Sequence, residues 1–126
     1  MRASLWMGLA FAAAAAPGAA RDLNAVPAAV ATGPARTCVP LSQLRESLVR
    51  NDSVIDFRIS GDRYYRVTLP QGCPGLGFEK RFAYETSLSQ LCAQDIITVL
   101  RTAPVMRGAS CGLAPFQPVT IAKTAK

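Results

Sequence analysis

The chain has 126 residues, a formal net charge of +6 and no histidine. A chain of this length typically forms one small domain rather than several. Without histidine it has neither a Ser-His or Cys-His nucleophile pair nor an imidazole metal site. We therefore predict no catalytic residue, no metal and no cofactor.

Residues 1–20 carry the pattern of a secretory signal peptide. Arg2 supplies a positive charge, an alanine-rich apolar stretch follows, and small residues end the segment at Ala20. The apolar stretch is shorter than the roughly 20 residues that cross a bilayer, so no transmembrane segment is predicted. We expect cleavage near Ala20 and a soluble periplasmic or secreted protein.

Residues 21–36 are rich in alanine and proline and lack a periodic apolar face. This composition predicts a disordered linker. Residues 37–121 follow as a single predicted domain, and residues 122–126 as a frayed tail. A domain this small needs constraints in addition to its hydrophobic core.

The predicted domain contains four cysteines, namely Cys38, Cys73, Cys92 and Cys111. Their spacing lacks the C-x2-C pairs that are typical of zinc sites. In a small exported domain they predict two disulfides. Three pairings are possible. We prefer Cys73 with Cys92, inside the domain, and Cys38 with Cys111, joining its ends.

The segment after the first cysteine has two interpretations. Leu41, Leu44 and Leu48 have helical spacing, and Pro40 suits the first turn of a helix. Residues 45–50 could also extend as a strand. We expect one short helical turn in Leu41–Val49, followed by a strand.

Residues 54–69 alternate between apolar and polar side chains on either side of Gly61-Asp62, which predicts a β-hairpin. A two-residue turn would place Phe57 opposite Arg66 and mix the two faces. A three-residue loop at residues 60–62, with Asp62 near the left-handed region, avoids this. The expected cross-strand pairs are Phe57 with Tyr65, Ile55 with Val67, and Asp56 with Arg66.

Three later segments are also predicted as strands. In residues 78–85, Phe78, Phe82 and Tyr84 share one side. Residues 95–100 are almost wholly apolar and suit a central strand. Residues 116–121 form an edge strand, because Pro118 cannot donate a ladder hydrogen bond. The predicted fold is mainly β, a small antiparallel sheet of about five strands curled into a barrel or sandwich.

The order of these residues resembles a family of small exported bacterial proteins with four spaced cysteines, grouped as a domain of unknown function. The resemblance covers roughly residues 37–119 and implies an exported single domain without a known activity. The residues that carry it are Cys38, the segment 52–57, Gly61, Tyr65, Leu69, the segment 73–76, Leu91-Cys92, the segment 95–97, Cys111-Gly112-Leu113 and Phe116.

The carboxylates of the domain are the remaining candidates for acid–base chemistry, namely Asp56, Glu79, Glu85 and Asp95. Strand alternation places most of them on solvated faces, where they serve as ion-pair partners. Asp95 follows Cys92 closely and is better suited to capping a turn. The same alternation places Phe57, Tyr65 and Phe82 in the core. The sequence therefore predicts that the protein is not an enzyme.

Arginines cluster around the first hairpin, namely Arg45, Arg50, Arg58, Arg63 and Arg66. A basic surface attracts anionic partners. For an exported protein these are lipid headgroups, anionic glycans or an acidic envelope protein, and nucleic acid is not expected. We predict Arg58, Tyr64 and Arg66 as contact residues. The opposing interpretation is a solvated strand face that Asp56 and Glu79 partly neutralise.

These observations favour a non-enzymatic binding or accessory module of the envelope. The alternative is a secreted inhibitor of a hydrolase, because small disulfide-rich domains often present a rigid loop. The loop at residues 72–77 or the loop at residues 107–112 would then be the inhibitory element.

Overall fold

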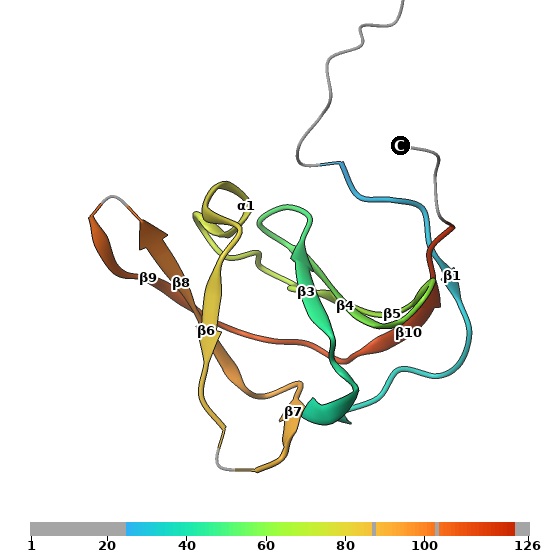
Figure 1. Cartoon of the computed structure of the whole chain (residues 1–126). Coiled ribbons are helices and arrows are strands. Elements are labelled where there is room, and N and C mark those ends of the chain that lie inside the picture. Colours follow the sequence, from blue (N-terminus) through green and yellow to red (C-terminus); the bar gives the residue numbers. More distant parts are fainter. Residues whose placement is uncertain (1–24, 87, 103, 123–126) are drawn as a thin grey trace, which may run out of the picture.

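The computed structural model describes residues 25–86, 88–102 and 104–122 (Figure 1). The predicted signal peptide, residues 21–24 and most of the predicted tail lie outside these ranges. As predicted, the described chain is mainly β and contains two disulfides.

The strands are β1 (Val30–Ala31), β2 (Cys38–Pro40), β3 (Glu46–Val49), β4 (Val54–Ser60), β5 (Arg63–Thr68), β6 (Phe82–Tyr84), β7 (Gln90–Cys92), β8 (Ile96–Thr102), β9 (Val105–Gly112) and β10 (Gln117–Thr120). The helical elements are a 3-10 turn, η1 (Leu41–Gln43), and α1 (Leu76–Glu79).

These strands form three antiparallel sheets rather than the single sheet that the sequence predicted. Their orders are β1-β10-β5-β4-β3, β6-β8-β9 and β2-β7. The described strands do not close into a barrel, so that alternative is wrong. The five-stranded and three-stranded sheets share one apolar core, in which Phe57 of β4 lies 5.8 Å from Phe116 and 6.2 Å from Phe82, ring centre to ring centre.

The β4–β5 hairpin has the predicted register, with Phe57 opposite Tyr65 and Asp56 opposite Arg66. The expected loop is wrong in detail. Ser60 pairs with Arg63, and the extra residue is taken up by a bulge between Arg58 and Ser60. Gly61, not Asp62, has the left-handed conformation, with φ of 54°, because glycine adopts it without a steric penalty.

The expected helical turn over Leu41–Val49 is not found. Only η1 forms, and β3 follows it, paired with β4 from Glu46 to Val49. Leu41 and Leu44 pack against the core from outside this strand. Pairing with β4 satisfies the backbone of β3, and this tertiary interaction overrides a short helical pattern.

The strand expected at residues 78–85 is divided into α1 and β6. Gly75 and Lys80 both have positive φ, 85° and 59°, and they begin and end the single turn of α1. Lys80 is the residue that interrupts the alternation of apolar and polar side chains in residues 78–85. As a consequence Leu76 is buried, whereas Phe78 is 87% exposed.

The two C-terminal strand predictions had different outcomes. The strand at residues 95–100 corresponds to β8, which is central between β6 and β9 as expected. The predicted edge position of β10 is wrong, because β10 lies between β1 and β5. The carbonyl of Pro118 accepts a hydrogen bond from Thr32, so its ring nitrogen also faces the short strand β1, and the β5 ladder loses no donor.

Part of the predicted linker belongs to the fold. Val30–Ala31 pairs with β10, and Arg36 exchanges two backbone hydrogen bonds of 2.8 Å with Phe116. These bonds tie residues 30–36 to the C-terminal strand, so the expectation of a disordered linker is wrong for this segment.

The preferred disulfide pairing is also wrong. Cys38 is bonded to Cys92, and Cys73 to Cys111. Cys38 and Cys92 are direct cross-strand partners in β2 and β7, with Cα atoms 4.0 Å apart. Cys73 precedes α1, and its bond to Cys111 fixes that turn to β9. Pairing of short strands distant in sequence therefore decided the connectivity.

A tryptic digest of the unreduced protein tests this pairing. We expect residues 37–45 to be linked to residues 82–101, and residues 67–80 to residues 108–123. Mass spectrometry with and without reduction identifies the linked peptides. A link between residues 67–80 and 82–101 would contradict the structure.

Candidate binding surface

The predicted contact residues lie on one face of the five-stranded sheet, opposite the core. Tyr65 and Val67 of β5 point into the core, so Tyr64 and Arg66 point away from it. Arg58 is the cross-strand partner of Tyr64 and shares this outer face. The structure therefore brings Arg58, Tyr64 and Arg66 together, as the strand alternation indicated.

The outer face is not simply solvated, because it contains the fully buried carboxylate of Asp56. Arg66 donates to both carboxylate oxygens, from Nε at 2.8 Å and from Nη2 at 3.0 Å. Arg50, at the end of β3, donates from Nε at 2.8 Å. The expectation that Asp56 faces solvent is wrong, although its predicted pairing with Arg66 is present.

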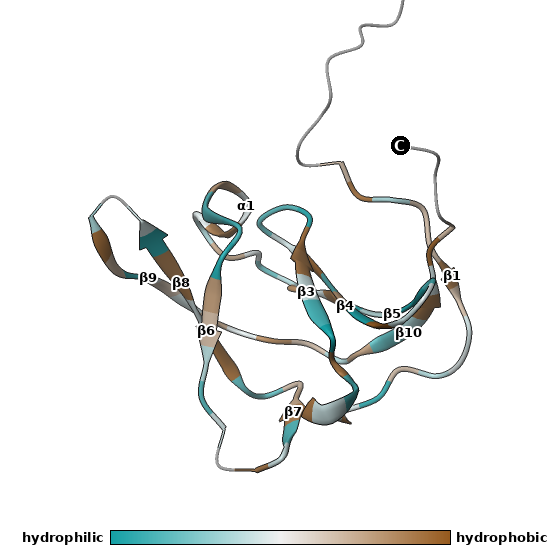
Figure 2. Cartoon of the chain, in the orientation of Figure 1, coloured by the Kyte–Doolittle hydropathy of each residue, from teal (hydrophilic) through white to brown (hydrophobic). Residues whose placement is uncertain are grey.

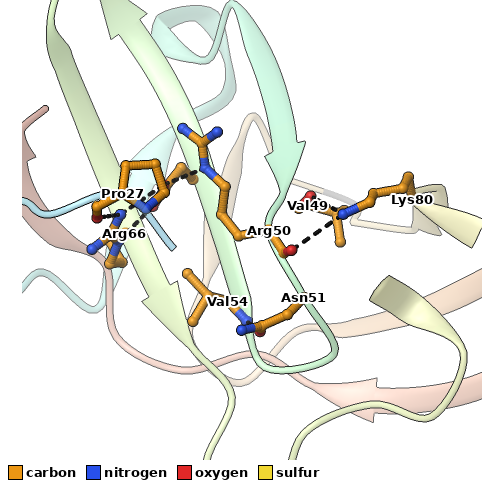
Figure 3. A network of polar contacts seen from close by, with 8 residues as sticks. Pro27, Val49, Arg50, Asn51, Val54, Arg66 and Lys80 are labelled. Carbon is orange, nitrogen blue, oxygen red and sulfur yellow. Dashed lines mark hydrogen bonds and ion pairs between the residues drawn. The ribbon is translucent and has the colours of Figure 1, made fainter. Parts of the chain in front are cut away.

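Arg66 also connects this network to the N-terminal segment. Its Nη2 donates to the carbonyl oxygen of Pro27 at 2.8 Å (Figure 3). Val119 of β10 points to the same face, because it pairs with Tyr64, and it is buried. Arg66 thus uses most of its N–H groups for hydrogen bonds within the protein, and few of them remain for a partner.

The remaining arginines of the hairpin differ in their availability. Arg58 lies 2.8 Å from Glu46, with 38% and 49% of the two side chains exposed. Among the described residues, no carboxylate pairs with the exposed Arg45 or Arg63. Internal pairing therefore neutralises much of the basic face that the sequence predicted.

The candidate carboxylates outside this face have structural partners. Asp95 accepts a hydrogen bond of 2.7 Å from the backbone N–H of Cys92, which confirms the predicted turn cap. Glu79 accepts a hydrogen bond of 3.3 Å from Thr102, and Glu85 lies 3.8 Å from Arg107. Within the described ranges, no cluster of three potential ligands could hold a metal ion.

The structure reveals an apolar surface that the sequence reasoning missed. Phe78 of α1 is 87% exposed and Val105 of β9 is 88% exposed, and the neighbouring Met106 is 47% exposed. We call these three residues the apolar tip. Figure 1 shows the β8–β9 hairpin projecting from the body, and Figure 2 shows the hydrophobic start of β9 and the hydrophobic part of α1. The only indication of this surface in the sequence was an apolar pair, Val105-Met106, directly after Pro104.

A groove of about 470 Å³ separates α1 from the β8–β9 hairpin. Pro74, Gly75 and Phe78 line one wall, and Val99, Arg101 and Ala109 line the other. The Cys73–Cys111 disulfide joins the two walls at one end, and the hydrogen bond between Glu79 and Thr102 joins them near the hairpin end. The position of Phe78 relative to the hairpin is thereby fixed.

Comparison of the chain with models of known families, with curated proteins and with solved structures found no match. The resemblance to the exported four-cysteine family therefore stays a prediction. In the described ranges, no helix has the length and apolar character needed to cross a membrane.

The Asp56 network makes a prediction about stability. Replacing Asp56 by Asn removes the buried negative charge and leaves Arg50 and Arg66 without their counter-ion. We expect this change to lower the free energy of unfolding by about 3 kcal/mol. The midpoint of urea unfolding under oxidising conditions measures this loss. Asp62→Asn, in the exposed β4–β5 turn, is the matched control and should leave the midpoint unchanged. Equal midpoints for the two variants would show that the network contributes little.

Proposed function

We propose that this chain is exported and acts in the periplasm, or outside the cell, as a non-enzymatic binding or accessory module. The observation that carries the proposal is the apolar tip, which exposes Phe78 and Val105 almost completely. Large apolar side chains that are exposed together commonly mark an interaction site. The tip, rather than the outer face with Arg58, Tyr64 and Arg66, is the main contact surface in this proposal.

Export is supported by two independent features. The first is the signal-peptide pattern of residues 1–20. The second is the presence of two disulfides and no free cysteine among the described residues. Disulfides persist in oxidising compartments and are rare in the cytosol.

A binding role rather than catalysis is supported by the use of the acidic side chains. Asp56 pairs with two arginines, and Asp95 caps the turn after β7. A general base must reach a substrate proton, and each of these carboxylates already accepts hydrogen bonds that stabilise the fold.

The alternative function, inhibition of a hydrolase, retains one of its two loops. Residues 107–112 are part of β9 and do not form a loop. Residues 72–77 do form a turn that leads into α1, and Cys73–Cys111 fixes it to the neighbouring strand. A rigid, cross-linked turn of this kind binds with little loss of conformational entropy.

The intact mass of the exported protein tests the localisation. We expect a chain that begins at Arg21, and a mass increase of four hydrogens on reduction, two for each disulfide. A retained leader or four free thiols would overturn the proposed compartment.

Site-specific cross-linking tests the contact surface. A photoreactive residue at position 105 should form a discrete adduct in cells, whereas the same residue at position 30 should not. Val30 is the control because it is also exposed, at 68%, but lies on β1, in the other sheet. If the adduct at position 105 is a hydrolase that the purified protein inhibits, the alternative function is correct. Equal labelling at both positions would remove the support for the tip.

A further inference from the structure

We infer that the apolar tip docks on the surface of an anionic lipid bilayer. This inference rests on the proposed function and names the class of partner for the same surface.

The two most exposed apolar side chains of the tip come from different elements but lie at the same end of the molecule. Glu79, next to Phe78, accepts a hydrogen bond from Thr102, and Thr102 is the cross-strand partner of Val105. Phe78 therefore lies on α1, where it lines the groove, and Val105 lies on the hairpin that forms the other side of this groove. Two separate exposed side chains of this kind can contact a surface that has no complementary cavity.

The backbone that carries Phe78 is held by several contacts, which keep this position at the surface. Leu76 is fully buried and anchors α1. Gly77 donates a hydrogen bond of 2.6 Å to the carboxylate of Asp52, and Cys73 donates one of 2.7 Å to the Asp52 carbonyl. The backbone of Gly77 lies so close to Asp52 that a Cβ atom at position 77 would be 2.9 Å from it. The exposure of Phe78 is thus imposed by the fold.

Basic side chains lie next to the tip. Arg101 is the cross-strand partner of Met106, and Arg107 is that of Leu100. The backbone of Arg81 accepts a hydrogen bond from Leu100. With Lys80, whose ammonium also donates to the carbonyls of Val49 and Arg50, this region has four cations against three carboxylates, Asp52, Glu79 and Glu85, a local net charge of +1. Basic residues near a membrane are attracted to anionic headgroups.

A bilayer surface fits this combination better than a protein pocket does. Apolar side chains enter the boundary between headgroups and acyl chains, while arginines beside them remain at the level of the phosphates. The headgroup region adapts to two separate projections, whereas a protein partner would need two matching cavities. The predicted contact is shallow and reversible, because two inserted side chains are far from a membrane anchor.

Vesicle sedimentation tests the inference directly. We expect the exported, purified protein to bind vesicles of equal parts phosphatidylglycerol and phosphatidylcholine, and to bind pure phosphatidylcholine vesicles much less. Binding should fall at high salt, because salt screens the attraction of exposed charges. A variant with both Phe78→Ser and Val105→Ser should bind the anionic vesicles at least ~10-fold more weakly.

Two matched controls make the comparison specific. Val30→Ser with Leu88→Ser removes exposed apolar side chains elsewhere, 68% and 60% exposed, and should not reduce binding. Arg101→Gln with Arg107→Gln should reduce binding more than Arg45→Gln with Arg63→Gln. The second pair removes two exposed arginines of the five-stranded sheet, one directly before β3 and one at the start of β5. All variants carry the same N-terminus, so any contribution of that segment cancels.

A second readout follows the tip itself. The only tryptophan of the chain lies in the predicted signal peptide, so Phe78→Trp places a single reporter at the tip after cleavage. Its fluorescence should shift to the blue on anionic vesicles and stay unchanged on phosphatidylcholine.

The possible outcomes separate the two proposals. Equal losses in the tip variant and its apolar control, or no preference for anionic vesicles, would overturn the lipid inference. If a discrete protein adduct still forms at position 105, the proposed binding function stands and its partner is a protein. If neither vesicle binding nor an adduct is observed, both proposals fail.

Discussion

The buried charge of Asp56 is the interaction on which the five-stranded sheet depends. A carboxylate without solvent contact costs several kcal/mol unless cations and hydrogen bonds compensate it. Here the compensation comes from Arg50, at the end of β3, and from Arg66 on β5. Three neighbouring strands must therefore be in register before the charge is neutralised. Because Arg66 also binds the Pro27 carbonyl, the N-terminal segment belongs to the same cooperative unit.

The two larger sheets have different roles in this arrangement. The five-stranded sheet uses most of its charged residues internally, so its outer face is held together by its own ion pairs. The three-stranded sheet and α1 instead project apolar side chains into solvent. This exposure is tolerated because it is local: Leu76 and the Cys73–Cys111 disulfide fix the base of the tip, and only Phe78 and Val105 extend fully beyond it.

Sequence patterns were informative where neighbouring residues determine the structure. Alternation and charge matching were sufficient for the β4–β5 register, because a slip would have placed apolar residues opposite arginines. They were not sufficient for α1, which depends on the left-handed conformations of Gly75 and Lys80. The disulfide pairing could not be predicted either, because β2 and β7 are three-residue strands without a periodic pattern. The exposure of Phe78 follows from these tertiary details and was therefore missed as well.

The disulfide connectivity has a consequence for the order of oxidation. The two bridges are interleaved, since Cys73 lies between Cys38 and Cys92 in the chain, and Cys92 lies between Cys73 and Cys111. A chain that emerges from its N-terminus presents Cys38 and Cys73 first, and the native protein never joins these two. Correct oxidation therefore requires that Cys38 of β2 stays reduced until Cys92 of β7 is present, or that an early non-native disulfide is later exchanged. Such thiol–disulfide exchange takes seconds to hours. With this pairing, neither native disulfide can form until the last third of the chain, which contains Cys92 and Cys111, is present.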